Sequence, residues 1–140
     1  MIREDLWEQW YQLLLSQWGL DYRLAFIVGA VQAALQTYDY DAVTITSGYR
    51  SPIRQKELQA KWDSGDRTGL AARPATRSWH MQGLAVDVST RSQNFNLFRE
   101  IMESVPGIRW GGRFKKVDRV HFDLPIGQPK SIDQLIAARF

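Results

Sequence analysis

The spacing of apolar residues at the start of the chain predicts two helices. Residues 3–18 and 21–35 place apolar side chains three or four positions apart, which is typical of amphipathic helices. Gly19 suits the end of the first helix, and Asp21 suits the N-terminal cap of the second. Since each helix has an apolar stripe, we expect the two to pack together.

The rest of the chain alternates between short strands and helices. β-Branched or alternating segments predict strands at residues 42–48, 83–89, 108–110 and 119–124. Helical spacing and capping residues predict helices at about residues 52–62, 95–105 and 131–140. Residues 63–77 have no apolar period and are predicted to form a long loop, a feature that is usually functional or mobile. This order predicts an α+β fold with a small antiparallel sheet flanked by helices.

Length and composition place limits on the kind of protein. A chain of 140 residues is expected to form a single domain, with a helical part at about 1–40, a core at about 41–125 and a C-terminal helix at about 131–140. There is no cysteine, so a metal site would have to use His, Asp or Glu. The N-terminus lacks the apolar core of a secretory signal, and no apolar run reaches the length of a membrane span. We therefore expect a monomer that is made in the cytoplasm and does not insert into a membrane.

The net charge of +3 is unevenly distributed. Basic residues outnumber acidic ones in segments 49–77 and 109–119. These segments could attract nucleic acid, anionic lipid or an anionic cell-wall polymer, or they could simply be solvated loops.

The two histidines of the chain both lie beside predicted strands. His80 precedes the second strand, Asp87 lies on its polar face, and His121 lies on the polar face of the last strand. If these strands pair, the three side chains can converge on one side of the sheet. Two imidazoles and one carboxylate leave a position open for water, as in a catalytic zinc site. The alternative is a set of unrelated polar residues.

Three motifs, which together span residues 43–124, resemble those of the LAS metallopeptidases. These are zinc enzymes that cut peptide bonds in peptidoglycan stems. The pattern SxHxxGxAxD is filled at every fixed position in residues 78–87, and SGYRSPxRQ occupies residues 47–55. The third motif is Trp-Gly-Gly at 110–112, followed by Asp118 and, three residues later, His-Phe. The resemblance implies a Hedgehog/DD-peptidase-like fold whose sheet carries the zinc site.

The resemblance implies one zinc ion held by His80, Asp87 and His121, with Asp118 as the general base. In a regular strand, a residue three positions before His121 would face away from it, so this role requires a turn between them. Asp123 shares a face with His121 and is therefore either a rival base or a partner that holds the imidazole.

The resemblance also assigns residues that contact the substrate. Arg50 would stabilise the developing oxyanion, although it could instead be an arginine paired at the surface. Gln55 would line the same cleft or lie on the helix surface. Ser78 would bind substrate or fix the turn before the strand. Gly83 and Ala85 are expected to keep space free beside the metal.

The implied function is hydrolysis of a peptidoglycan stem peptide. Short relatives without a signal sequence are often phage endolysins that cut the L-Ala–D-Glu bond, which is the activity we expect here. Such an enzyme would reach the cell wall after release or inside a phage particle. One alternative is a D-Ala-D-Ala carboxypeptidase, and another is a non-catalytic wall-binding or phage-tail component with the same fold. Nucleic-acid binding rests only on the basic pI of about 9.4 and is not expected.

Overall fold

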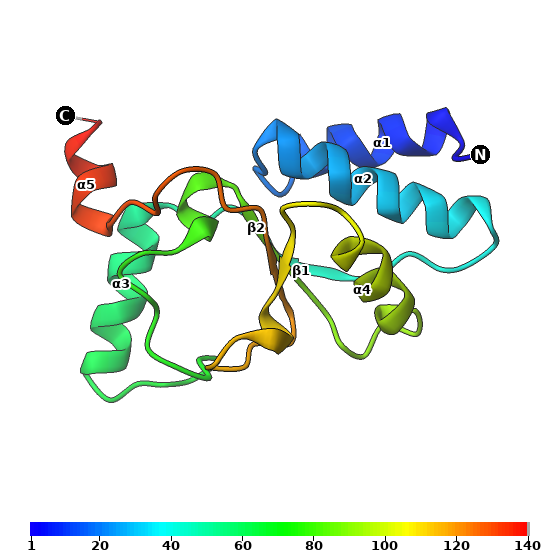
Figure 1. Ribbon diagram of the computed structural model, residues 1–140. Helices are drawn as coiled ribbons and strands as arrows, with labels where there is room; N and C mark the ends of the chain where they lie inside the picture. The colour runs from blue at the N-terminus through cyan, green and yellow to red at the C-terminus, as the bar shows by residue number, and fades with distance from the viewer. Residues whose placement is uncertain (140) are drawn as a thin grey trace.

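The computed structural model describes residues 1–139, and Figure 1 shows a small central sheet with helices on both sides. The helices α1, α2 and α4 lie on one side of the sheet, and α3 and α5 pair on the other. The bounds of the helices are α1 (Glu4–Ser16), α2 (Tyr22–Thr37), α3 (Pro52–Asp63), α4 (Phe95–Glu103) and α5 (Ile132–Ala137). Within residues 1–139, no helix combines the length and the apolar character needed to cross a bilayer.

The predicted helices are confirmed, with differences at their ends. Asp21 caps α2 by accepting a hydrogen bond from the backbone N–H of Arg23, and Ser51 caps α3 in the same way from Arg54. Ser131 and Gln134 form a capping box at the start of α5. The last helix ends at Ala137 rather than at 140, and residue 140 lies outside the described residues.

The sheet is antiparallel throughout and has the strand order β1-β2-β4-β3. Its strands are β1 (Ile45–Ser47), β2 (Ala85–Val88), β3 (Arg109–Trp110) and β4 (His121–Asp123). All four are shorter than predicted. Two short 3₁₀-helices that were not predicted, η1 (Trp79–Gln82) and η2 (Gly111–Arg113), precede β2 and follow β3.

One face of the sheet is packed in the core. Val86, Val88 and Phe122 are fully buried there, and the Phe122 ring meets Phe98 of α4 edge to face at 5.3 Å. Burial of these side chains under α1, α2 and α4 fixes which way β2 and β4 face. Consequently the alternate residues, including Asp87 and His121, point to the opposite side of the sheet.

The predicted alternation is wrong at two positions that lie just before a strand. By alternation from Asp87 on the polar face, the predicted strand at 83–89 places Leu84 on the core face, but Leu84 belongs to a separate small cluster with Trp79 and Ala85. By alternation from His121, the predicted strand at 119–124 places Val120 on the core face, but Val120 lines a cleft on the other side of the sheet. The physical reason is that β2 begins at Ala85 and β4 at His121, so each residue lies just before its strand, where side-chain alternation does not hold.

Candidate active site and metal centre

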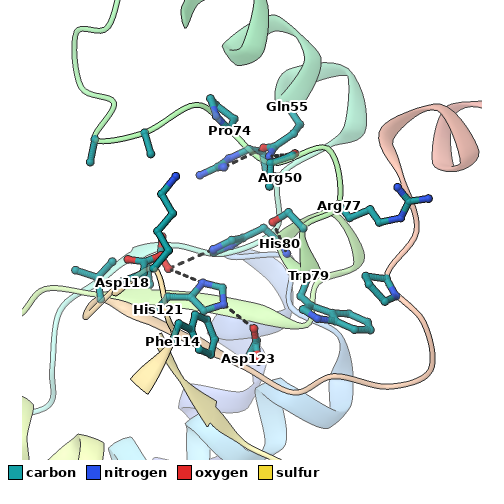
Figure 2. Close-up of a pocket in the computed structure, with 18 of the residues that line it drawn as sticks. Arg50, Gln55, Pro74, Arg77, Trp79, His80, Phe114, Asp118, His121 and Asp123 are labelled. Atoms are coloured by element: carbon teal, nitrogen blue, oxygen red, sulfur yellow. Dashed lines mark hydrogen bonds and ion pairs between the residues drawn. The ribbon is translucent and has the colours of Figure 1, made fainter. Parts of the chain in front are cut away.

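A cleft of about 990 Å³ opens over the polar face of the sheet. Residues 69–75 of the long loop form one wall, and the chain between β4 and α5 contributes to another. Figure 2 shows His80 and His121 at the floor of this cleft, with Asp118 on one side and Trp79 and Arg77 on the other. The predicted site residues therefore gather in one cleft, although they come from three separate segments of the chain, residues 50–55, 78–87 and 118–123.

Two imidazoles and one carboxylate form a tight group at the floor. One nitrogen each from His80 and His121 and a carboxylate oxygen of Asp87 lie within 4.8 Å of one another. His80 Nε2 is 3.2 Å, and His121 Nδ1 3.4 Å, from Asp87 Oδ1. Asp87 and His121 are direct cross-strand neighbours on β2 and β4, and η1 supplies His80. The pairing of the two strands is thus what brings the group together, as the sequence predicted.

Each imidazole is held by the nitrogen that points away from Asp87. His80 Nδ1 donates to the backbone carbonyl of Gly48 at 2.8 Å, and His121 Nε2 lies 2.7 Å from Asp123 Oδ2. Outer partners of this kind fix the ring orientation and the tautomer of metal-binding histidines. They leave His80 Nε2 and His121 Nδ1 free to bind a metal.

The spacing of the three ligand atoms suits a small tetrahedral metal ion. Zinc–nitrogen and zinc–oxygen bonds are about 2.0–2.1 Å long, so neighbouring ligand atoms around tetrahedral zinc lie about 3.3 Å apart. The two distances from Asp87 Oδ1, 3.2 and 3.4 Å, match that spacing, and the two imidazole nitrogens lie within 4.8 Å of each other. Three protein ligands also leave the fourth position to water or substrate. The residues present therefore fit one zinc ion.

Without a metal, the group is held together by shared protons. Burial opposes the charge on Asp87, but hydrogen bonds from His121 and His80 outweigh it and hold the pKa of this carboxyl well below its ordinary value. Burial alone would lower the pKa of His121, whereas its bonds to Asp123 and Asp87 raise that pKa to about 9. His121 is therefore an imidazolium at neutral pH, and a metal must displace its proton.

This proton predicts a pH dependence of zinc binding. Because the pKa of His121 is raised from 6.5 to about 9, the competing proton is present at pH 7 and is lost as the pH rises through about 9. The apparent affinity for zinc should rise about tenfold per pH unit from pH 7 to 8 and level off above pH 9. Competition with a chelator of known pH dependence measures this slope. A flat profile between pH 7 and 8 would contradict the proposed competition.

A turn before β4 brings Asp118 to the group. The N–H of His121 donates to the carbonyl of Asp118 at 3.2 Å, so the backbone turns where a strand would have carried Asp118 to the other face. The N–H of Asp118 in turn donates to the carbonyl of Gly111 at 2.9 Å. Desolvation at the cleft wall, followed by the negative charge of Asp87, raises the pKa of the Asp118 carboxyl. A carboxylate with a raised pKa is suited to accept and return a proton.

Gly111 leaves the space that this turn needs. A Cβ atom at this position would lie 2.1 Å from the carbonyl oxygen of Asp118 and 3.1 Å from the Cβ of His121. Gly111→Ala should therefore displace Asp118 and lower the rate of hydrolysis on the order of 10²-fold, the usual effect of misplacing a catalytic group by about 1 Å. Gly65→Ala is the control for the added methyl group, because a Cβ atom at Gly65 would have nothing within 4 Å; its φ of +96° adds a backbone strain that Gly111, whose φ is not positive, does not have. The loss of turbidity of purified cell walls gives the rates of hydrolysis. Equal rates for Gly111→Ala and Gly65→Ala would refute the expected role of Gly111.

Asp123 has the position of a hydrogen-bond partner of His121 rather than that of a general base. It is 1% exposed, its Oδ2 lies against His121, and both of its oxygens accept hydrogen bonds from Arg109 at 2.8 and 2.9 Å. Burial opposes its charge, yet His121 and Arg109 lower its pKa. A carboxylate that is buried and occupied at both oxygens has no access to a substrate proton.

The remaining predicted residues lie at the cleft with different contacts. Arg50 lines the cleft and donates to Gln55 Oε1 at 3.0 Å. Gln55 is 1% exposed and also donates to the carbonyl of Ala75, so it links Arg50 to the long loop and is not a surface residue. The hydroxyl of Ser78 accepts from the backbone N–H of His80 at 3.2 Å and so fixes the turn of η1. Ser78 lines the cleft as well.

The expectation that Gly83 keeps space free beside the metal is wrong. It has a φ of +71°, and a Cβ atom there would lie 2.7 Å from the backbone nitrogen of Asp21. Its carbonyl accepts a hydrogen bond from that same nitrogen at 2.9 Å. The close neighbour of Gly83 is therefore the turn between α1 and α2. Ala85 is fully buried and packs with Trp79 and Leu84.

Two residues of the site were not predicted. Arg109 binds Asp123, whereas the sequence indicates only that it belongs to a basic segment. The ring centroid of Phe114 lies 5.8 Å from that of His121, and no motif of the sequence points to this contact. The signal for Arg109 was its place next to the Trp-Gly-Gly motif. Its partner could not be identified without the register between β3 and β4.

The fold is that of a peptidoglycan peptidase, the class to which the matching family belongs. The family model for VanY, D-alanyl-D-alanine carboxypeptidase, matches residues 19–134, and the chain therefore belongs to this family. The predicted resemblance and the α+β fold are confirmed. Among solved structures, the chain is similar to the L-Ala D-Glu endopeptidase ChiX of Serratia marcescens, with 23% identity, 86% of each chain covered and a TM-score of 0.48. No curated protein matches the sequence.

Proposed function

We propose that the protein is a zinc-dependent endopeptidase that cuts peptidoglycan stem peptides, at the bond between L-Ala and D-Glu. The observation that carries this proposal is that the ligand atoms of His80, Asp87 and His121 lie within 4.8 Å of one another, in the same cleft as Asp118 and Arg50. Family membership supports a hydrolase that acts on peptidoglycan. The presence of every expected functional residue argues against a non-catalytic wall-binding component.

The side chains around the group have complementary roles in this proposal. Zinc held by the two imidazoles and Asp87 would acidify a water molecule and polarise the scissile carbonyl. Asp118 accepts the proton of the attacking water and passes it to the nitrogen of the leaving amine. The guanidinium of Arg50 donates hydrogen bonds to the carbonyl oxygen as negative charge develops there. The bond between Arg50 and Gln55 holds that guanidinium in the cleft before substrate binds.

The shape of the cleft supports an endopeptidase. It extends past His80 and His121 in both directions, toward Asp118 on one side and toward Trp79 and Arg77 on the other (Figure 2). A carboxypeptidase has to hold the terminal carboxylate one residue beyond the scissile bond and needs no further room there. A volume of about 990 Å³ lies at the upper end of the range for ligand sites and accommodates several residues of a stem peptide.

Cleavage of the terminal D-Ala–D-Ala bond is the second candidate, and the description of the matching family favours it. Arg50, Arg77 and Lys116 line the cleft, and within residues 1–139 none of the three has an acidic partner. Such cations could bind a terminal carboxylate or the acidic groups within a stem peptide. Their charge is therefore compatible with both candidates.

Digestion of purified peptidoglycan distinguishes the candidates. The protein is incubated with cell walls in zinc, or in zinc with excess chelator, and the released fragments are identified by mass. New L-Ala and D-Glu termini that appear only without chelator would support the proposal. Release of D-Ala alone would replace it with the carboxypeptidase, and unchanged fragments in zinc would refute both activities. We further propose that the protein works as a monomer on the cell wall, after release from the cytoplasm or from a phage particle.

A further inference from the structure

Arg109 and Asp123 form a paired unit beneath the cleft. They are cross-strand neighbours on β3 and β4, and the guanidinium binds both carboxylate oxygens, Nε to Oδ1 at 2.8 Å and Nη2 to Oδ2 at 2.9 Å. Two parallel bonds of this kind fix the plane of a carboxylate as well as its distance. Asp123 is 1% exposed, whereas half of the Arg109 side chain is exposed at the cleft. The arginine is thus the link between a buried carboxylate and the cleft surface.

The oriented carboxylate of Asp123 meets only one nitrogen of His121. Its Oδ2 lies 2.7 Å from Nε2, while Nδ1 faces Asp87. A carboxylate can only accept a hydrogen bond here, so Nε2 must carry the hydrogen. His121 must then present Nδ1, without its proton, to a metal.

Phe114 completes this arrangement. The guanidinium carbon of Arg109 lies 4.8 Å from the centroid of the Phe114 ring, which in turn lies 5.8 Å from the centroid of His121. The ring is thus a second contact of the Arg109 guanidinium, beside its two bonds to Asp123. Arg109 is therefore fixed by two contacts, both of which lead to the same histidine.

We infer that Arg109 is a positioning residue for the metal: it orients Asp123, which fixes His121 as a ligand through Nδ1. The inference rests on the metal site of the proposed function but not on the bond that is cut. Arg109 need not contact the substrate for this role. Its loss would leave a buried carboxylate free to rotate away from Nε2.

Zinc affinity of the folded protein, measured without substrate, tests this inference. Arg109→Met should weaken zinc binding by about 10- to 100-fold, the usual effect of losing a partner behind a ligand. Arg109→Lys should recover part of that loss, because it keeps the charge but not the paired bonds. Arg113→Met is the matched control: Arg113 also binds a carboxylate, that of Glu103, through two nitrogens, and it contacts the ring of Trp110, but it does not line the cleft. The zinc affinity of this control should stay within about twofold of that of the natural protein.

A spectroscopic readout separates positioning from simple loss of stability. In the zinc-loaded natural protein, the Nε2 hydrogen of His121 should give a protected ¹H–¹⁵N resonance, which should shift or vanish in Arg109→Met but not in Arg113→Met. If Arg109→Met fails to fold, the comparison uses Arg109→Lys, for which at least a threefold loss of affinity is expected. Unchanged zinc affinity in the folded variant, or an equal loss in Arg113→Met, would overturn the inference. If zinc affinity depends on Arg109 as expected but the protein cuts no peptidoglycan, the inference holds and the proposed function is refuted.

Discussion

We expect Asp118→Asn to lower the rate of stem-peptide hydrolysis by about 10²- to 10⁴-fold, the range for loss of a general base, with zinc still bound. Asparagine keeps the size of the side chain but cannot accept the proton. The turn should survive, because Asp118 makes its hydrogen bonds to Gly111 and His121 through the backbone. The ligand group should survive as well, because its hydrogen bonds do not involve this side chain.

The measurement combines initial rates on purified cell walls with the zinc content per chain after gel filtration. Asp133→Asn is the matched control, since its side chain is 87% exposed on α5 and lies outside the cleft. The control should keep the natural rate and the natural zinc content. An Asp118→Asn protein with full activity would show that another group takes the proton. A variant that lost zinc as well would make Asp118 part of the metal site.

The same assays decide between the two acids that the sequence left open. Asp123→Asn should reduce zinc affinity first and activity as a consequence, because Asp123 contacts His121 and is closed to substrate. Asp118→Asn should reduce activity alone. If the two patterns were exchanged, the roles of the two acids would be exchanged as well.

The composition of the ligand group could be predicted because it depends on short-range rules. Alternation along β2 and β4 placed Asp87 and His121 on one face, and the chain offers no further histidine besides His80. The motif at residues 78–87 then supplied the family. Caps at Asp21 and Ser51 were predictable for the same reason, since each bonds to a backbone N–H two or three residues away.

Features that depend on contacts distant in sequence could not be predicted. The carbonyl of Gly48 that holds His80 lies 32 residues away, and Gly83 takes its role from the turn at Asp21. The pairing of Arg109 with Asp123 requires the register between β3 and β4, which neither strand specifies alone. The ends of strands are a further limit, because side-chain alternation stops where the chain turns, as at Val120, which precedes β4 and lines the cleft.

We expect Asp87→Asn to abolish both zinc binding and hydrolysis. Asp87 Oδ1 lies 3.2 Å from His80 Nε2 and 3.4 Å from His121 Nδ1, the two nitrogens that would bind the metal. Its negative charge is therefore next to both of the other ligands. A neutral amide is a weaker ligand and leaves the metal without a negative partner. The loss of affinity should exceed the about 10- to 100-fold that loss of an outer partner costs.

Removal and return of the metal separates this effect from damage to the fold. A chelator should inactivate the natural protein, and added zinc should restore it, whereas Asp87→Asn should stay inactive at the same zinc concentration. Asp133→Asn again serves as the control and should respond to chelator and zinc as the natural protein does. Full activity of Asp87→Asn, or of the natural protein in excess chelator, would exclude the metal mechanism. Since Asp118→Asn should keep zinc and Asp87→Asn should not, the two variants together distinguish the residue that moves a proton from the residue that holds the metal.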